Sequence, residues 1–225
     1  MHHIRLSSLS NVLVFFDFDN TVTLFDLLDD LIKHFSINKE WVALEEAWAA
    51  GKIGSRKCLE GQLKGVRVTK KELVKYLSYV RIDPGFHKVH DLLRKEGITP
   101  VILSDNFTFI INTILKNNGI KGAKVFANSL RIKGDRLFPS FPHTNLHCLR
   151  CAHCKKKNLQ KKGIRDKLIL YVGDGLSDIC PAECSDTVFA KGKLLQHFRK
   201  TKRLCVAFDT QEDIYNYFRG LDNEQ

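Results

Sequence analysis

The sequence predicts an α/β protein, built on a doubly wound parallel sheet with helices on both faces and an inserted helical segment. Three observations predict this fold. Short apolar runs alternate with stretches of helical periodicity over most of the 225 residues. The first run, at residues 12–18, opens almost continuously apolar, which is typical of a strand buried on both faces. Residues 23–80 then show helical spacing without a convincing strand and interrupt the alternation.

The interrupting segment has the pattern of several short helices. Apolar residues recur every three or four positions around residues 24–35, 41–48, 55–63 and 73–80. Glycines at 51, 54 and 65 separate these stretches. Thr69, with Glu72 three residues later, has the pattern of a capping box and predicts the start of the last helix. Trp41 and Trp48 lie at helical spacing, which favours packing in the interior of this segment over contact with a ligand.

Strands and helices alternate again after Asp83-Pro84-Gly85. We expect helices at 86–96, 106–118, 155–163, 176–183, 194–199 and 211–218, and strands at 98–104, 123–129, 168–172 and 187–190. Residues 130–138 have the pattern of a hairpin that turns at Lys133-Gly134-Asp135, and residues 139–153 that of an irregular loop. The chain therefore divides into a core domain, residues 1–22 and 82–225, and a helical cap domain, residues 23–81.

The formal net charge of +11 favours anionic partners such as nucleic acid, anionic membranes or phosphorylated small molecules. Basic residues cluster, as at residues 155–157, but mostly on helix-like segments without interleaved aromatic residues, which favours solvated helix faces. No apolar stretch approaches the length that spans a bilayer. We therefore expect neither a nucleic-acid nor a membrane partner. Seven cysteines and an N-terminus without a signal-peptide pattern predict a reducing, cytoplasmic setting.

Polar residues gather where three of the expected strands end. In doubly wound sheets, ligands bind at the carboxyl ends of the strands. The chain places carboxylates, hydroxyls and amides at these ends: Asp17, Asp19 and Thr21; Ser104, Asp105 and Asn106; then Asp174 and Asp178. Such groups suit Mg²⁺, which prefers hard oxygen ligands and usually keeps a substrate phosphate among them. Asp17, the backbone carbonyl of Asp19 and Asp174 could supply the protein's ligands.

The same residues suit phosphoryl transfer. A carboxylate can attack phosphorus and form an aspartyl-phosphate, which splits hydrolysis into two steps. A second carboxyl group two residues later points the same way on a strand, and it can protonate the leaving oxygen and then activate water. Ser104 and a lysine can hold the phosphoryl oxygens. Asp105 is also placed to cap the helix that follows.

The segments DFDNT, ILSDN and VGDGLSD resemble the first, second and fourth motifs of the haloacid dehalogenase superfamily. The resemblance runs from Val12 to about Phe218, and the helical insertion resembles the cap of the branch that contains phosphoserine phosphatase. It implies a Rossmann-like core and a Mg²⁺-dependent phosphatase acting on a small phosphorylated metabolite. Asp17 would be the nucleophile, Asp19 the general acid/base, and Asp174 a Mg²⁺ ligand supported by Asp178.

Within that superfamily the chain is most similar to the methionine-salvage phosphatases that act on 2-hydroxy-3-keto-5-methylthiopentenyl-1-phosphate. Those proteins also carry a cysteine-bearing loop that runs into Cys-Lys before the fourth motif. The corresponding stretch here is 147–155, so the resemblance assigns the third-motif lysine to Lys155 rather than Lys191. Vertebrate phosphoethanolamine/phosphocholine phosphatases share this layout more loosely. Together, Ser104 and Lys155 would bind the phosphoryl group.

Two departures bear on the substrate. Phosphoserine phosphatases carry a glutamate nine residues after the nucleophile, where this chain has Asp26, and a cap arginine where it has Leu59. Arg56 lies near that position without aligning with it. Phosphoserine is therefore disfavoured. Asp26 and Arg56 are the candidate substrate contacts in the cap, and Thr21, Asp105 and Asn106 are the candidate substrate contacts in the core. Phosphotransfer to an acceptor other than water stays an alternative, whereas the intact Asp17/Asp19 pair disfavours a non-catalytic basic binding module.

The cysteine-bearing loop has a second interpretation. Cys148, Cys151 and Cys154 follow a C-x₂-C-x₂-C spacing, and His147, or one of the other nearby histidines, could complete a tetrahedral structural zinc site. The usual second Cys-x₂-Cys pair is missing, so unliganded thiols are favoured. Because Cys154 directly precedes Lys155, we expect this loop to hold the lysine in place with or without a metal.

Overall fold

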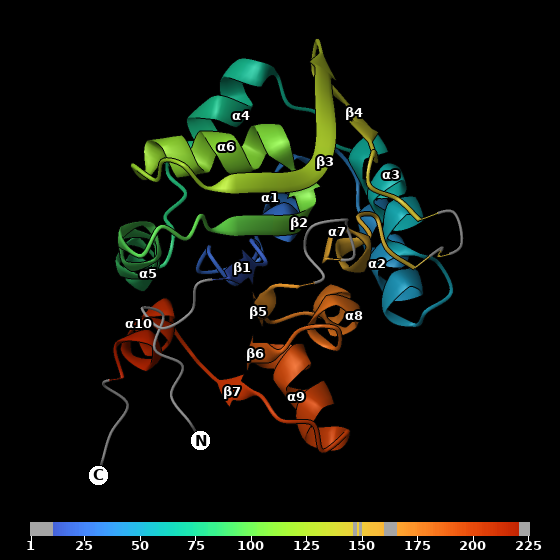
Figure 1. Cartoon of the computed structure of the whole chain (residues 1–225). Coiled ribbons are helices and arrows are strands. Elements are labelled where there is room, and N and C mark those ends of the chain that lie inside the picture. Colours follow the sequence, from blue (N-terminus) through green and yellow to red (C-terminus); the bar gives the residue numbers. More distant parts are fainter. Residues whose placement is uncertain (1–10, 146–147, 149, 160–165, 221–225) are drawn as a thin grey trace.

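The computed structural model describes residues 11–145, 148, 150–159 and 166–220. Within these ranges a seven-stranded sheet has the order β4-β3-β2-β1-β5-β6-β7 (Figure 1). Every neighbouring pair is parallel except β3–β4. The strands are β1 (Val12–Phe16), β2 (Val101–Phe107), β3 (Lys124–Lys133), β4 (Arg136–Ser140), β5 (Leu168–Gly173), β6 (Thr187–Ala190) and β7 (Val206–Ala207). The predicted doubly wound α/β class is confirmed.

The strand order reverses at β1, and this reversal positions the site. From β1 the chain builds β2, β3 and β4 on one side and later β5, β6 and β7 on the other. A crevice forms at such a switch point, because the connections on its two sides leave in opposite directions. The carboxyl ends of β1, β2 and β5 meet there.

Helices cover both faces of the sheet (Figure 1). On one side lie α5 (Pro84–Lys95) and α10 (Gln211–Arg219). On the other lie α7 (Lys155–Leu159), α8 (Ile179–Ala182), preceded by the 3₁₀ turn η2 (Leu176–Asp178), and α9 (Gly192–Lys200). Successive residues of β1 reach the two sides in turn, as a strand requires: Phe16 packs on Phe86 of α5, and Phe15 joins the cluster that contains Leu194 of α9.

The insertion contains α1 (Leu27–Phe35), α2 (Glu40–Ala49), α3 (Ser55–Lys64) and α4 (Lys70–Leu77). A β-bridge between Thr23 and Ile82 closes its base. Its buried leucines, such as Leu27 and Leu63, share one apolar cluster with the sheet residue Phe16. The amide of Val68 also donates to the carbonyl of Asp135 in the β3–β4 turn (2.8 Å). The insertion thus packs on the core, while its division from the core at 22/23 and 81/82 stays a prediction.

The elements depart from the expectations in a few places. β2 runs to Phe107, three residues beyond the predicted end, and α6 (Thr108–Asn117) begins later. The Ser104 hydroxyl accepts the amide of Asn106, and a register shift lies between Leu103 and Phe107, so side-chain hydrogen bonds shape this strand end. The expected helix at 176–183 is split between η2 and α8. β7 was not predicted, because two residues are too few to show a period.

The predicted hairpin is formed by β3 and β4, which pair in antiparallel fashion and turn at Gly134 with φ of 61°. That left-handed conformation favours glycine. The helix expected at 155–163 is described as far as Leu159, and the remainder lies outside the described residues. Among the described helices, none combines the length and the apolar composition needed to cross a membrane.

Candidate active site

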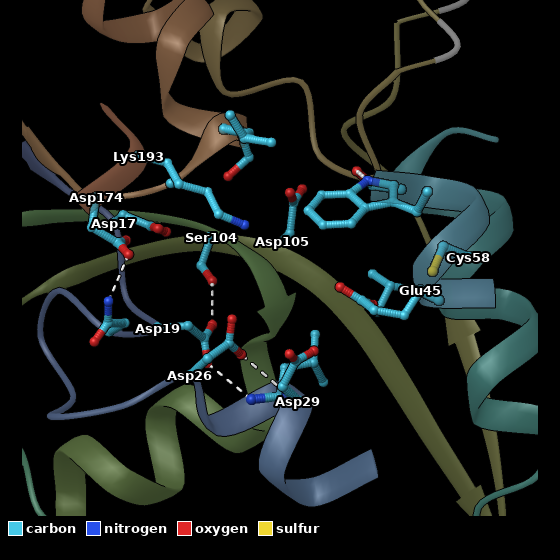
Figure 2. Close-up of a pocket in the computed structure, with 18 of the residues that line it drawn as sticks. Asp17, Asp19, Asp26, Asp29, Glu45, Cys58, Ser104, Asp105, Asp174 and Lys193 are labelled. Atoms are coloured by element: carbon cyan, nitrogen blue, oxygen red, sulfur yellow. Dashed lines mark hydrogen bonds between the residues drawn. The ribbon is translucent and has the colours of Figure 1, made fainter. Parts of the chain in front are cut away.

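A cavity of about 450 Å³ lies between the carboxyl ends of β1, β2 and β5 and the helices of the insertion (Figure 2). Its wall carries seven carboxylate side chains and two lysines. The residues that line it are Asp17, Asp19, Asn20, Asp26, Leu28, Asp29, Glu45, Trp48, Ser55, Cys58, Leu59, Gln62, Ser104, Asp105, Lys155, Asp174, Gly175, Leu176, Ser177, Gly192 and Lys193.

The turn after β1 fixes the first carboxylates. The amide of Asp17 continues the sheet by donating to the carbonyl of Val172 on β5 (2.9 Å). The carbonyl of Phe18 then accepts the amides of residues 21–23, which closes a tight turn. Asn20 takes a left-handed conformation (φ 51°) that asparagine tolerates better than most residues. The turn places Asp17 and Asp19 beside each other at the floor of the cavity.

Lys155 reaches this floor from the start of α7. Its Nζ lies 2.6 Å from Oδ1 of Asp17 and 2.7 Å from Oδ1 of Asp178. The lysine side chain is 1% exposed, so both contacts form away from water. Burial alone would lower the pKa of Lys155, but Asp17 and Asp178 raise it well above its usual range. Lys155 is therefore a fixed cation. Lys191 instead donates to the carbonyl of Asp209 (3.4 Å).

Asp178 organises the loop after β5. Its Oδ2 accepts the amides of Asp174 and Gly175 (3.1 and 2.9 Å), and its Oδ1 accepts Lys155 and the Tyr171 hydroxyl (2.6 Å). Gly173 leaves room for this arrangement, because a Cβ there would lie 2.7 Å from the Asp178 carboxylate. With its acceptor positions taken, Asp178 supports the loop and the lysine.

The carboxylates of Asp17 and Asp174, with Asp178 supporting them, fit a divalent cation. Within the described part of the chain, each offers an oxygen within 4.8 Å of the others. Burial and repulsion from Asp178 raise the pKa of Asp17 well above its usual range despite the nearby lysine. A divalent cation would relieve this crowding of hard oxygens around a single ammonium. Asn20 Nδ2 and the Thr21 hydroxyl donate to the Asp174 carboxylate (2.7 and 3.1 Å) and fix its position.

Asp19 has a different environment from Asp17. Its carboxylate accepts Asn106 Nδ2 (3.0 and 3.1 Å), the Ser104 hydroxyl (3.3 Å) and the amide of Leu28 (3.2 Å). Burial and the nearby Asp26 raise the pKa of Asp19 to about 8. A carboxyl group that holds its proton near neutral pH suits a general acid. Figure 2 shows Ser104 pointing toward Asp19 and joined to it by a hydrogen bond.

The structure distributes the expected substrate-binding residues among several positions. Asp26 lines the cavity, and its side chain also caps α1 by accepting the amide of Asp29. Thr21 and Asn106 lie just behind the wall, where they hold Asp174 and Asp19. Asp105 lines the cavity without capping α6, whose N-cap residue makes no side-chain hydrogen bond.

The structure does not place Arg56 on the cavity wall, where the sequence analysis expected a substrate contact. It lies on α3 but not on the cavity wall; it pairs with Glu60 (2.9 Å) and stacks on Phe141. The cavity-facing residues of α3 are Ser55, Cys58, Leu59 and Gln62, which follow the spacing of one helix face. Arg56 and Glu60 occupy another face. The helical spacing around Leu59 therefore contained the signal that separates these two sets.

The insertion contributes several residues that sequence reasoning did not single out. Trp48 was expected in the interior; it is instead half-buried on the cavity wall, with its Nε1 donating to the Ser55 hydroxyl (2.9 Å). Glu45 and Asp29 lie on the same side of the cavity (Figure 2). Lys193 of α9 points toward the side that holds Asp105 (Figure 2). A charged Glu45 between Leu44 and Trp48 was the available signal.

The zinc interpretation receives no support. Within the described residues, the cysteines of the loop form no group whose ligand atoms lie close enough to hold a metal. His147 lies outside the described residues. Cys148, Cys151 and Cys154 are free thiols, and burial, with the negative Asp105 nearby, raises the pKa of Cys151 to about 12.

Comparison with known proteins agrees with this geometry. The 2-hydroxy-3-keto-5-methylthiopentenyl-1-phosphate phosphatase of Geobacillus kaustophilus is 27% identical over 221 residues, covering 94% of this chain and 97% of that protein. Its Bacillus velezensis counterpart is 24% identical over 216 residues, covering 94% and 90%. Pdp3-interacting factor 1 of Schizosaccharomyces pombe is 26% identical over 220 residues, covering 92% and 95%.

Solved structures show the same fold. A substrate-bound phosphoserine phosphatase complex matches with a TM-score of 0.69 at 19% identity, over 92% of this chain and 98% of that one. A phospho-aspartyl intermediate analogue of phosphoserine phosphatase matches with a TM-score of 0.68 at 18% identity, over 92% and 97%. Fold and relatives together define a phosphatase built on a doubly wound α/β sheet. The chain belongs to the family described as Putative Phosphatase, which matches residues 12–200.

Proposed function

We propose that this phosphatase hydrolyses a small phosphomonoester in a Mg²⁺-dependent reaction through an aspartyl-phosphate on Asp17. The observation that carries the proposal is the pair of carboxylates at the end of β1, of which Asp17 contacts Lys155 and Asp19 accepts hydrogen bonds from residues of β2. Burial also raises the pKa of Asp19 to about 8. Asp17, Asp174 and the carbonyl of Asp19 would hold Mg²⁺, which would neutralise the charge of the phosphoryl oxygens. Asp178 would hold the loop that carries Asp174 and would fix Lys155.

The reaction divides between the two carboxyl groups. An oxygen of Asp17 attacks phosphorus, the bond from phosphorus to the leaving oxygen breaks, and Asp19 gives its proton to that oxygen. Asp19, now a carboxylate, takes a proton from water as the water attacks the aspartyl-phosphate, which releases phosphate and restores Asp17. Lys155 and Ser104 hold the phosphoryl oxygens at the floor of the cavity. Their fixed positions lower the reorganisation that charge development would otherwise require.

For the substrate, the relatives support a methionine-salvage ester. The relatives from Bacillus velezensis and Geobacillus kaustophilus are phosphatases of 2-hydroxy-3-keto-5-methylthiopentenyl-1-phosphate, whose leaving group ends in a methylthio group. Leu28, Leu59 and Trp48 give the cavity an apolar surface on the side of the insertion. A thioether packs well on such aliphatic and aromatic side chains. We take this ester as the first candidate.

A second candidate is favoured by charge. Asp29 and Glu45 lie on the cavity wall away from the phosphate end, and burial, followed by repulsion from Glu45, raises the pKa of Asp29. A cationic leaving group would relieve that repulsion, and the Trp48 ring could contact a quaternary ammonium. Phosphoethanolamine and phosphocholine have this chemistry. Phosphoserine is less suited, because its carboxylate would face these acids and Leu59 in place of an arginine.

Phosphate release from a panel of esters tests both the proposed reaction and the proposed substrates. The panel contains the salvage ester, phosphocholine, phosphoethanolamine and phosphoserine, each with Mg²⁺ or with EDTA. We expect Mg²⁺-dependent release, with one of the first three esters preferred. No release from any phosphomonoester in Mg²⁺ would contradict the proposed reaction, and release that EDTA does not abolish would contradict the role of the metal.

A further inference from the structure

Asp105 is a carboxylate of the cavity wall that the proposed reaction does not use. It follows Ser104 on β2, and successive residues of a strand point to opposite sides. Figure 2 shows the result, with Ser104 pointing toward Asp19 and Asp105 pointing away from it. The backbone of Asp105 is fixed, because its carbonyl accepts Nδ2 of Asn128 on β3 (2.6 Å). The Asp105 side chain therefore projects from a backbone position that is held by the sheet.

The Asp105 side chain reaches the loop that precedes α7. Its Oδ1 accepts the backbone amide of His153 at 2.7 Å. His153 is 1% exposed, and its Nε2 lies 2.5 Å from Nδ2 of Asn158, one turn into α7. The next amide, that of Cys154, donates to the carbonyl of His143 (2.9 Å). Of the two residues before Lys155, His153 is thus bonded to Asp105 of β2 and Cys154 to His143 of the loop.

Lys155 needs such an anchor. It is the first residue of α7, so no earlier turn of this helix precedes it and fixes its backbone. The backbone at Lys155 is therefore placed by the residues in front of it. The ammonium at the far end must meet Asp17 at 2.6 Å and Asp178 at 2.7 Å. A shift of the loop backbone would move the start of α7 and lengthen these contacts.

We propose that Asp105 is a positioning residue for catalysis: by accepting the amide of His153 it holds the loop so that Lys155 reaches Asp17. This inference rests on the proposed phosphatase reaction, and it differs from the substrate contact expected at this position. The carboxylate acts here as a hydrogen-bond acceptor from a neutral amide. An asparagine oxygen can accept the same bond, whereas alanine cannot.

The test compares Asp105→Asn with Asp105→Ala, using hydrolysis of p-nitrophenyl phosphate in Mg²⁺. We expect Asp105→Ala to lower kcat by about 10- to 100-fold with KM within about threefold, because a misplacement of about 1 Å at a catalytic group can cost about 10²-fold. Asp105→Asn should recover at least about tenfold of that loss. Asp91→Ala, at a carboxylate whose side chain is 81% exposed, is the matched control. If Asp105→Ala does not fold, Asp105→Ser, whose hydroxyl is too short to reach His153, replaces it.

Hydrogen–deuterium exchange of residues 150–157 gives a second readout that does not depend on activity. The peptide should exchange faster in Asp105→Ala than in wild type, and Asp105→Asn should restore protection. Two results overturn the inference: a raised KM with unchanged kcat, which indicates a substrate contact, or unchanged exchange in Asp105→Ala. If wild type hydrolyses no ester, the proposed function fails, and the exchange comparison still decides whether Asp105 holds the loop.

Discussion

The two ends of the cavity differ in how firmly their charged groups are held. At the sheet end, Asp17, Asp19 and Asp174 each accept hydrogen bonds from residues of other parts of the core. At the insertion end, Asp29 lies 3.9 Å from Lys33, and Glu45 accepts a hydrogen bond from Gln62 at 3.1 Å. Asp17 is also buried, whereas Asp29 and Glu45 are only half-buried. On the proposed reaction, this contrast would separate groups that must not move during chemistry from groups that meet the variable part of a substrate.

This difference has a physical reason. Phosphoryl transfer develops charge at fixed places, so pre-positioned groups in a dry site stabilise it most. The leaving group differs from ester to ester, and its binding needs only complementary shape and charge. Substitutions at the sheet end should therefore change the rate on every ester, whereas substitutions at the insertion end should change the ranking of esters.

The largest effect should follow from Asp17→Asn. The amide lacks the nucleophilic oxygen, so turnover should fall by at least about 10³-fold on all esters. The side chains have nearly the same shape, and the variant should stay folded by circular dichroism. Steady-state phosphate release measures the rate. A variant that retains near wild-type turnover would remove Asp17 as the nucleophile.

Asp19→Asn should have the next largest effect. It leaves Asp17, Lys155 and Asp174 in place but removes the proton donor and acceptor, so kcat should fall by roughly 10²-fold or more. The loss should be smaller for p-nitrophenyl phosphate, whose leaving oxygen needs less protonation. Equal losses on poor and good leaving groups would contradict the role of Asp19 in protonating the leaving oxygen.

Glu45→Gln should affect specificity instead. If the leaving group is cationic, kcat/KM for phosphocholine should fall about tenfold relative to p-nitrophenyl phosphate, because one complementary charge is lost. Glu46→Gln, on the exposed side of the same helix, is the matched control and should leave that ratio unchanged. A ratio unaffected by Glu45→Gln would favour the neutral salvage ester.

Sequence patterns predicted the sheet end better than the insertion end. The alternation of strands and helices predicted the parallel sheet, and the strand ends carry a recognisable spacing of Asp17, Asp19 and Asp174. Lys155 was the harder choice, since nothing local distinguishes it from Lys191, and the resemblance decided it. Its contacts with Asp17 and Asp178 depend on a loop whose path no periodicity describes.

The insertion end could not be assembled in the same way. Its wall combines two residues from the start of α1 with faces of α2 and α3, and the packing of short helices is a tertiary property. Helical periodicity does show which residues share a face, so it groups Cys58 with Gln62 and sets Arg56 apart. It does not show which face meets the cavity. Only the packed structure brings Glu45 and Asp29 to the same wall.

The smallest expected effect is on stability, and it tests whether Asp19 at the sheet end is protonated in the folded protein. In the metal-free protein the pKa of Asp19 is about 8, against a usual value of 3.8, because it is buried beside Asp26. Between these values the folded protein holds a proton that the unfolded chain has released. The free energy of unfolding should therefore fall as pH rises from about 4 to 8, and Asp19→Asn should lack this contribution. In EDTA, the melting temperature of Asp19→Asn minus that of wild type should rise by several degrees across this window and level off above it, since about 1 kcal/mol corresponds to roughly 2–4 °C in a chain of this size. Glu46→Gln should show a flat difference. A flat difference for Asp19→Asn as well would mean that Asp19 is ionised in the folded protein and that burial does not raise its pKa.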